Sequence, residues 1–310
     1  MKVAITGSSG LIGSAVTKQL RASGHDIIEM KRGAKGDPQA IWNPAEGWVR
    51  DGALAGIDAV VNLGGENIGG GRWTASRKRL LRASRIDATR VLVDELKRQG
   101  IRPAVFVQGS GVDYYGGRGD ERLDESASAG SNFLAQLCVE WEAEANRAAG
   151  ELGSRVAIAR TSFVMDREAP AFKRLVMPIK FGVGGKLGSG RQWFPWVHLE
   201  DEARAIEFLL TADVSGPVNI AAPETITNAG ITKVLGSVLK RPTLFPVPGF
   251  ALKLLLGEMA QVLLLDSKRV VPTKLAEAGF RWEYPTADEA VREATGRAPK
   301  AAPQPAVSGR

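Results

Sequence analysis

The sequence is poor in the residues that build disulfides and metal clusters. Cys138 is the only cysteine among 310 residues, which excludes an intrachain disulfide and a cysteine-based metal cluster. His25 and His198 are the only histidines. We therefore expect no zinc or other metal site.

Long uninterrupted hydrophobic runs are also missing. The most apolar window, Leu244 to Leu265, is broken by two prolines, Lys253 and Glu258. We interpret it as a buried helix rather than a membrane span. The first strand is predicted to start at Lys2, which leaves no room for a signal peptide. We expect a cytoplasmic protein with no membrane partner.

The charge balance is basic, with a formal net charge of +7 and an isoelectric point near 9.6. The cations are dispersed, apart from the stretch from Arg72 to Arg90. A phosphorylated cofactor or an acidic substrate explains a basic cleft more simply than nucleic acid does. We expect a small-molecule substrate, no nucleic-acid partner, and allow for a homodimer.

Three glycines, each three residues apart, stand between a predicted strand and a predicted helix near the N-terminus. The strand covers Lys2 to Thr6, and apolar residues recur at helical spacing from Leu11 onward. This arrangement is typical of the turn that holds a dinucleotide pyrophosphate at a helix N-terminus, the alternative being a purely structural turn. The predicted cofactor-binding residues of this turn are Gly7, Ser9, Gly10, Leu11, Ile12 and Gly13.

The residues after the second predicted strand indicate which dinucleotide binds. Asp26 to Met30 forms this strand, and NAD-binding chains usually place an acidic residue at its end, beside the ribose. Here Lys31 and Arg32 follow. Two cations suit the 2'-phosphate of NADP, with Arg32 as its partner. We expect NADP(H) to be preferred over NAD(H), and a solvated basic turn is the alternative.

Strands and helices alternate through the next hundred residues, which predicts an α/β fold with a doubly wound parallel sheet of the Rossmann type. The predicted strands are Ile57 to Leu63, Ala104 to Gln108 and Val156 to Arg160, and the predicted helices are Arg85 to Gly100 and Leu134 to Glu151. After the third strand, Leu63, Gly64 and Gly65 should pass close to the cofactor. Arg85 is a further predicted cofactor-binding residue.

The later chain breaks this rhythm and predicts a smaller, mainly helical C-terminal capping lobe. We expect a Rossmann domain at 1–225, with a capping segment at about 166–196. The capping lobe should cover 226–296. Residues 297–310 have the composition of a disordered tail.

Several strings resemble a known superfamily, the extended short-chain dehydrogenases/reductases, which include nucleotide-sugar epimerases and dehydratases. They are the Gly7-x-x-Gly10-x-x-Gly13 spacing, Asn62-Leu63-Gly64-Gly65, Tyr115-Gly116 and Val197-His198-Leu199-Glu200-Asp201. Other strings are similar to an atypical branch called epimerase family proteins, which has a C-terminal domain of unknown function. These are Arg72-Trp73-Thr74, Ser84-Arg85-Ile86, Gly188-Ser189-Gly190-Arg191-Gln192-Trp193 and Ala278-Gly279-Phe280.

The chain departs from the superfamily where the resemblance implies catalysis. Active members carry a Tyr-x-x-x-Lys pair on the long central helix, and the corresponding stretch here, Phe133 to Cys138, has neither residue. Sugar-nucleotide epimerases also carry a diphosphate-binding arginine where this chain has Phe194. Arg191 lies three residues earlier.

Two residues remain as candidates for catalysis. The resemblance places Ser110 where a hydroxyl binds the substrate. Tyr115 follows on the same loop and would donate a proton if a cation such as Arg85 or Lys78 lowered its pKa. The alternative for Tyr115 is a packing role. His198, on a strand predicted from Val197 to Asp201, is more often structural.

Four residues are candidates for substrate binding. Arg72 and Trp73, with Lys78 nearby, form a basic aromatic cluster suited to an anionic or planar ligand. Arg191 and Trp193 lie in a glycine-bracketed loop that either lines a pocket or fastens the capping lobe to the sheet.

Three functional hypotheses follow. The first is an NADP-dependent oxidoreductase or epimerase that acts on an unidentified small molecule without the usual Tyr-Lys pair. The second is a non-catalytic protein that senses NADP. The third, a nucleic-acid-associated protein, depends only on the isoelectric point.

Overall fold

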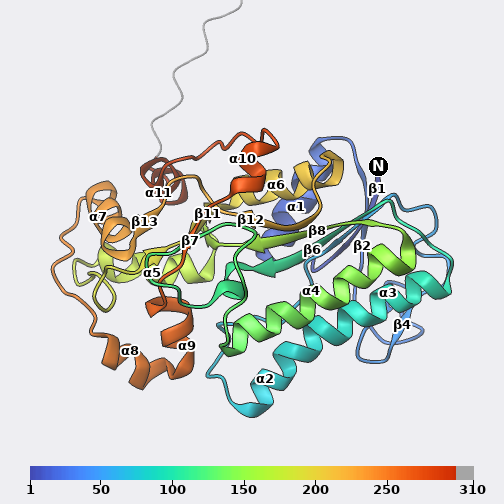
Figure 1. Cartoon of the computed structure of the whole chain (residues 1–310), viewed down its shortest axis with the longest axis horizontal. Coiled ribbons are helices and arrows are strands. Elements are labelled where there is room, and N and C mark those ends of the chain that lie inside the picture. The colour runs from blue at the N-terminus through green and yellow to red at the C-terminus, as the bar shows by residue number, and fades with distance from the viewer. Residues whose placement is uncertain (298–310) are drawn as a thin grey trace, which may run out of the picture.

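A six-stranded parallel sheet forms the centre of the computed structural model, which describes residues 1–297 (Figure 1). Its strand order is β12, β8, β6, β5, β1, β2. These strands span Gly216–Ile220, Arg155–Thr161, Val105–Gly111, Ala59–Asn62, Lys2–Thr6 and Asp26–Glu29. The chain runs from β1 to one edge and then crosses back to build the other side. The predicted doubly wound sheet is therefore confirmed.

Alternation along the strands produces the two helical layers. Val3 and Ile5 of β1 face a cluster that includes α1 (Leu11–Ala22) and α6 (Leu199–Thr211). Ala4, between them, faces the opposite cluster with α3 (Ala88–Arg98) and α4 (Phe133–Leu152). Figure 1 shows these helix pairs on opposite sides of the sheet. Because both faces are covered, the strands are apolar almost throughout.

The C-terminal lobe is mainly helical. Its core joins α5 (Pro170–Lys180), α7 (Asn228–Leu239) and α11 (Ala287–Ala294), at the left of Figure 1. The remaining lobe helices are α8 (Gly249–Leu256), α9 (Glu258–Ala260), the π-helical turn η3 (Gln261–Leu265) and α10 (Thr273–Glu277). Within residues 1–297 no helix has the length and apolarity needed to span a bilayer.

Short strand pairs fasten the connections and the lobe. The pairs are β3 (Trp42–Asn43) with β4 (Trp48–Val49), β7 (Arg122–Leu123) with β14 (Arg269–Val270), β9 (Phe163–Met165) with β11 (Trp196–His198), and β10 (Trp193–Phe194) with β13 (Ile226–Thr227). The buried Lys268 also donates to Asp113 at 2.7 Å. Asp113 belongs to η2 (Val112–Tyr115), so this ion pair joins the lobe to the loop after β6.

Two predicted elements differ in the structure, and a third lies almost entirely outside the described residues. The strand predicted from Val197 to Asp201 ends at His198, and α6 begins at Leu199 because three acidic residues in its first turn favour a helix N-terminus. The helix predicted from Arg85 starts as a π-helical turn, η1 (Ala83–Asp87), which follows α2 (Ala75–Arg82). The tail predicted at 297–310 lies, from residue 298 on, outside the described residues.

The window from Leu244 to Leu265 is also not the buried helix that its composition predicts. It divides into α8, α9 and η3, separated at Gly257, whose φ of +65° favours glycine. Phe250 and Leu254 of α8 are exposed. Buried Leu252 is the exception on this helix, so α8 packs only one narrow side against the lobe.

A chain of buried polar side chains lies beneath the glycine-rich turn. Asn62, at the end of β5, accepts from the Thr6 hydroxyl at 2.6 Å and donates to Gln108 at 2.8 Å and Thr89 at 2.9 Å. All four side chains are at most 2 % exposed. Trp141 of α4 also donates to Thr89, at 2.9 Å. Asn62 thereby joins three strands to two helices.

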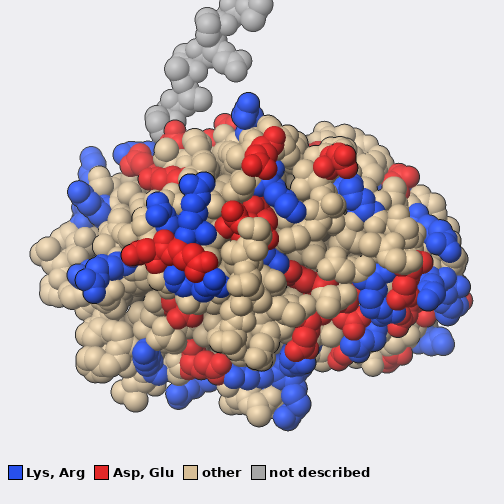
Figure 2. Space-filling model, in the orientation of Figure 1, with Lys and Arg blue, Asp and Glu red and all other residues tan. Residues whose placement is uncertain are grey.

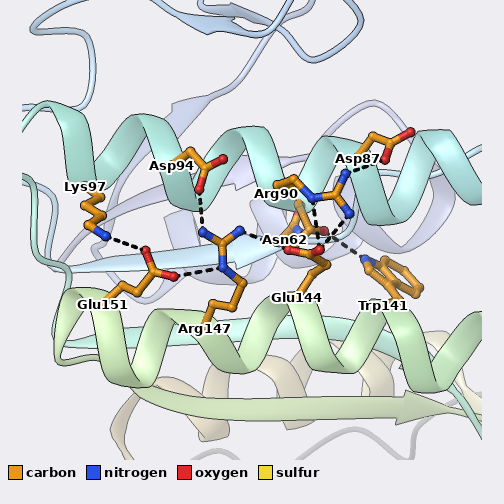
Figure 3. A network of polar contacts seen from close by, with 10 residues as sticks. Asn62, Asp87, Arg90, Asp94, Lys97, Trp141, Glu144, Arg147 and Glu151 are labelled. Carbon is orange, nitrogen blue, oxygen red and sulfur yellow. Dashed lines mark hydrogen bonds and ion pairs between the residues drawn. The ribbon is translucent and has the colours of Figure 1, made fainter.

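Ion pairs on the surface hold α3 against α4 above this network (Figure 3). Arg147 of α4 bonds to Asp94 of α3 at 2.6 Å, and Arg90 of α3 bonds to Glu144 at 2.7 Å. Lys97 and Glu151 close the same row at 3.0 Å. Each half-exposed pair contributes little alone, but together they fix one helix relative to the other.

We predict that Asn62→Ala lowers the free energy of unfolding by about 2–4 kcal/mol, because it leaves several buried polar groups without partners. Urea unfolding followed by circular dichroism measures this change. Asn67→Ala, at an exposed position, should change stability by less than about 0.5 kcal/mol and serves as the control. Equal effects of the two substitutions would contradict the role of the network.

Candidate functional site

The glycine-rich turn between β1 and α1 requires glycine at two positions for steric reasons. Gly7 has a φ of +68°, and a Cβ there would lie 2.8 Å from the Leu63 carbonyl oxygen. A Cβ on Gly13 would lie 2.0 Å from the Gly7 carbonyl oxygen, so only glycine lets α1 pack this closely. These two glycines shape the turn itself.

Gly10 has a different role, because it leaves the N-terminus of α1 open. It is the N-cap residue, and no side chain accepts hydrogen bonds from the first N–H groups of the helix. The N-termini of α4, α7 and α11, in contrast, are capped by Asn132, Thr227 and Thr286. Uncapped N–H groups and the positive end of the helix dipole suit a pyrophosphate. The turn therefore fits the predicted cofactor group.

A cleft of about 550 Å³ opens in front of this turn. Seven of the predicted cofactor residues line it: Gly7, Ser9, Gly10, Arg32, Leu63, Gly64 and Gly65. Leu11, Ile12, Gly13 and Arg85 do not line it. Lys31, which the sequence indicated together with Arg32, also lines it. Seven further lining residues were not predicted: Ser8, Glu29, Met30, Trp42, Pro44, Ser84 and Ala88. Trp42 and Pro44 belong to the hairpin after β2, and Ser84 and Ala88 belong to η1 and α3, so their positions depend on tertiary packing.

Charges of both signs meet at the end of this cleft beside β2. Lys31 and Arg32 are exposed, and Arg32 forms a bridge to Trp42 of β3. Glu29, the last residue of β2, accepts from Arg21 at 2.7 Å, and this bond holds the pKa of the carboxyl below its ordinary value. Glu29 occupies the strand end where an acidic residue would bind a ribose, and this positional rule could have found it from sequence.

Arg85 lies behind the loop that lines the cleft. Its guanidinium is buried, donates to the Glu66 carbonyl oxygen at 3.0 Å, and stacks 5.1 Å from the Trp141 ring. A Cβ on Gly65 would lie 2.9 Å from its central carbon. Burial lowers the pKa of Arg85 to about 10. Arg85 thus supports the Leu63–Glu66 backbone.

A buried polar cluster surrounds the predicted catalytic residues. The Ser110 hydroxyl donates to Glu142 Oε1 at 2.6 Å, and Arg160 binds both oxygens of Glu142, at 2.9 and 2.8 Å. Ser110 itself is half-buried at the end of β6. Glu142 lies on α4, so this helix presents a carboxylate bound to arginine toward Ser110.

Tyr115 is a fully buried member of the same cluster. Its hydroxyl donates to Asn219 at 2.7 Å and accepts from Arg160 at 3.0 Å. The cation beside Tyr115 is therefore Arg160, and the expectation that Arg85 or Lys78 would lower its pKa is wrong. Burial raises the pKa of Tyr115 to about 12. The Tyr115 hydroxyl therefore keeps its proton at neutral pH. Its side chain has a packing role, which was the alternative considered from the sequence.

Cys138 lies on the same side of α4, one turn before Glu142. Its thiol is a free thiol, donates weakly to the Gly111 carbonyl oxygen at 3.8 Å, and is buried. Burial raises the pKa of Cys138 to about 12. A thiol with this pKa is not a nucleophile at neutral pH.

A second cleft, of about 570 Å³, lies between the loop after β6 and the C-terminal lobe. Tyr115–Arg118 and Ala129–Asn132 form one wall, and Glu258, Gln261, Val262 and Asp266 form the other. Asn132 caps α4. This cleft therefore depends on both parts of the chain.

The predicted basic aromatic cluster lies near the second wall. Lys78 pairs with Glu258 at 2.5 Å and stands 4.7 Å over the Phe133 ring. Trp73 packs edge-on against Phe133, with ring centres 5.4 Å apart, while Arg72 is exposed. Glu258 of the lobe thus offsets the positive charge of Lys78, whereas the charge of Arg72 remains exposed.

The loop with Arg191 and Trp193 fastens the lobe to the rest of the chain. Trp193 donates to Asp120 at 2.9 Å, and Arg269 stacks 4.7 Å above its ring. The crevice beside Trp193 and Trp196 measures about 10 Å³, which is too small for a ligand. Arg191 is exposed. Of the two roles that the sequence left open for Trp193, these contacts favour fastening.

His198 and Glu202 are buried titratable groups at the start of α6. His198 caps the helix by accepting from the Glu200 N–H at 3.3 Å, and burial lowers its pKa to about 4. Glu202 accepts from the Thr161 hydroxyl at 2.6 Å, and burial raises its pKa to about 8. Both residues are neutral at pH 7, and Glu202 lies at the end of β8.

These features define a class, the doubly wound α/β proteins with a dinucleotide-type turn after the first strand. The chain belongs to the NAD dependent epimerase/dehydratase family, whose pattern matches residues 3–221. A domain of unknown function, DUF1731, matches residues 247–294. The resemblance seen in the sequence motifs is confirmed.

Similar proteins cover almost the whole chain. An epimerase family protein from Mycobacterium bovis, Mb2239, is 43% identical over 95% of this chain and 98% of its own length. The crystal structure of human epimerase family protein SDR39U1 (isoform 2) with NADPH has a TM-score of 0.84 at 29% identity, over 96% of this chain and 99% of that one. Thermus thermophilus UDP-glucose 4-epimerase, in complex with NAD, has a TM-score of 0.72 at 15% identity over 96% and 98%, which shows the fold alone.

We predict that Arg32→Asp weakens NADPH binding by roughly tenfold or more and leaves NADH binding equal or stronger, because it removes the predicted partner of the 2'-phosphate. Isothermal titration calorimetry of both dinucleotides measures this. Gly10→Leu is the comparison: its side chain obstructs the phosphate path and should abolish binding of both. Equal losses with Arg32→Asp would disprove the 2'-phosphate contact.

We predict that the stability of the wild-type protein falls between about pH 4.5 and about pH 8 relative to that of Glu202→Gln. The folded state keeps Glu202 protonated up to a pKa of about 8, whereas the unfolded carboxyl ionises near 4.5. The stabilisation is therefore complete below the unfolded pKa and disappears as pH rises through the folded pKa. Unfolding midpoints across this range measure it, and parallel pH profiles of the two proteins would contradict it.

Proposed function

We propose that this protein is an NADP(H)-binding oxidoreductase or epimerase-like enzyme that acts on a small molecule. The dinucleotide would lie along the cleft in front of Gly10, and the substrate would enter the second cleft. Ser110, at the end of β6, would face the substrate side.

The open N-terminus of α1 is the observation that carries this proposal. It combines free N–H groups with the 550 Å³ cleft, and Lys31 and Arg32 provide exposed positive charge at its far end. The similar human protein was crystallised with NADPH. Glu29 lies beside these cations, but its pairing with Arg21 reduces its effect on a phosphate. NADP(H), when bound, supplies a hydride or accepts one.

The chain's own residues would bind and orient the substrate. The second cleft is lined by the polar side chains of Arg118, Ser131 and Asp266, of which Ser131 is exposed and the other two are half-buried, and such a lining suits a polar small molecule. Arg72, beside the lobe, adds an exposed positive charge. These contacts favour a polar or anionic substrate.

The proton chemistry must differ from that of the wider superfamily, because α4 contains neither tyrosine nor lysine. Ser110 is the hydroxyl at the strand end, and Glu142 holds it by accepting a hydrogen bond from it at 2.6 Å. Arg160 pairs with both oxygens of Glu142 and fixes the position of this carboxylate. Ser110 is thereby oriented, so that its oxygen accepts a hydrogen bond from a substrate hydroxyl.

A non-catalytic NADP sensor is the second candidate. The titratable groups around Ser110 are already bound to one another, and burial takes the pKa values of Tyr115 and Cys138 to about 12. No group of this cluster has a pKa near 7 among those with a resolved shift. A protein that binds the dinucleotide without turnover would need no such group.

Calorimetric titration with NADPH, followed by a screen of carbonyl compounds for NADPH oxidation, tests the proposal. We predict tight NADPH binding and turnover of a polar carbonyl compound. Ser110→Ala should lower kcat/KM by roughly 10- to 100-fold without changing NADPH affinity, because one oriented hydrogen bond is lost.

Ser126→Ala is the matched control. Ser126 also donates to a carboxylate, that of Asp124, but is exposed on a turn. Binding without turnover on every compound would favour the sensor. Absence of binding would disprove both candidates.

A further inference from the structure

Large exposed hydrophobic side chains gather on one part of the C-terminal lobe. Among residues 1–297, eleven large hydrophobic residues are exposed, and eight of them come from two segments, 177–183 and 244–255. We call these eight the apolar face: Met177, Phe181, Val183, Leu244, Phe245, Phe250, Leu254 and Leu255. Phe181, Phe250 and Leu254 are 76–79 % exposed, which is far beyond the exposure of scattered surface hydrophobes.

Backbone contacts hold the two segments of this face together. The Phe245 N–H donates to the Gly184 carbonyl at 3.3 Å, and Val247 donates to Lys186 at 2.9 Å. Leu187 and Val247 also form a β-bridge. Helix α8 follows directly. These contacts bring the two segments that carry the exposed apolar side chains next to each other.

The two segments that carry the apolar face, with their flanking residues, contain charged residues of one sign only. Residues 169–199 and 225–257 contain no aspartate and no glutamate. Their cations are Lys173, Arg174, Lys180, Lys186, Arg191, Lys233, Lys240, Arg241 and Lys253, all exposed. Only Lys173 has an acidic partner in the described chain, the neighbouring Glu168. Figure 2 shows the surface over α8, at the lower left, as largely uncharged with isolated basic groups.

We propose that this face docks onto the surface of a membrane that contains anionic lipids. Aromatic and leucine side chains that project beside lysine and arginine suit the boundary between lipid headgroups and acyl chains. Each cation near an anionic bilayer adds attraction that salt screens. The contact is peripheral, and it differs from the sequence-based expectation of no membrane partner, which stays a prediction.

A second copy of the chain fits this face less well. In a two-fold dimer the same surface meets itself, so the basic rims would oppose one another without an acidic group to offset them. Glu258, at the border of α8, is already paired with Lys78. An anionic bilayer provides the missing negative charge over the whole face.

Co-sedimentation of the full chain with lipid vesicles tests this inference. We expect binding to phosphatidylcholine vesicles that contain phosphatidylglycerol, with weak binding to phosphatidylcholine alone and a loss at high salt. The double variant Phe250→Ser/Leu254→Ser should lower the partition coefficient roughly tenfold or more. Lys180→Glu/Lys253→Glu should lower it on anionic vesicles only.

Matched controls lie elsewhere on the surface. Leu80→Ser/Val139→Ser removes two exposed hydrophobes outside the face, and Lys18→Glu reverses an exposed cation on α1. Both should bind vesicles like the wild type, and circular dichroism checks that every variant folds. Absence of vesicle binding, or binding that the face variants leave unchanged, would overturn the inference. So would light scattering that shows a dimer which Phe250→Ser/Leu254→Ser dissociates.

Discussion

The hydrogen bonds of Asn62 are the constraint on which the site depends. This one amide joins the ends of β1, β5 and β6 to α3, and through Thr89 to Trp141 of α4. The Thr6 hydroxyl that donates to Asn62 also accepts from the Gly64 N–H at 3.0 Å. The two loops that line the cofactor cleft are thereby fixed to one buried group. Because loss of any of these bonds would leave a buried polar group without a partner, they hold the strand ends in their relative positions.

The sequence predicted the sheet and the glycine-rich turn between β1 and α1 well, because both depend on local patterns. The apolar pattern of each strand and the spacing of the three glycines can each be recognised within a few consecutive residues. The ends of elements were less predictable: α6 starts at Leu199 because acidic residues compete with the β-type pattern before it. The structure of residues 244–265 depends on how they pack against the rest of the lobe, and composition does not determine that packing.

Side-chain roles in the candidate site required the structure. Ser110 and Glu142 are 32 residues apart, and Arg160 comes from another strand, so no spacing rule connects them. Tyr115 was a candidate acid from its place on the loop, whereas its burial between Arg160 and Asn219 makes it part of the core. Glu29, in contrast, could have been found, since strand-end position alone indicates it.

The second cleft has one wall from each part of the chain, and this has a consequence for how such proteins diverge. The Tyr115–Asn132 wall belongs to the segment that also builds the sheet, whereas the Glu258–Asp266 wall belongs to the lobe. Substitutions in the lobe wall leave the dinucleotide turn untouched. With the substrate placed in the second cleft as proposed, exchange of a few residues of α9 and η3 would change the ligand preference while the turn between β1 and α1 stays the same.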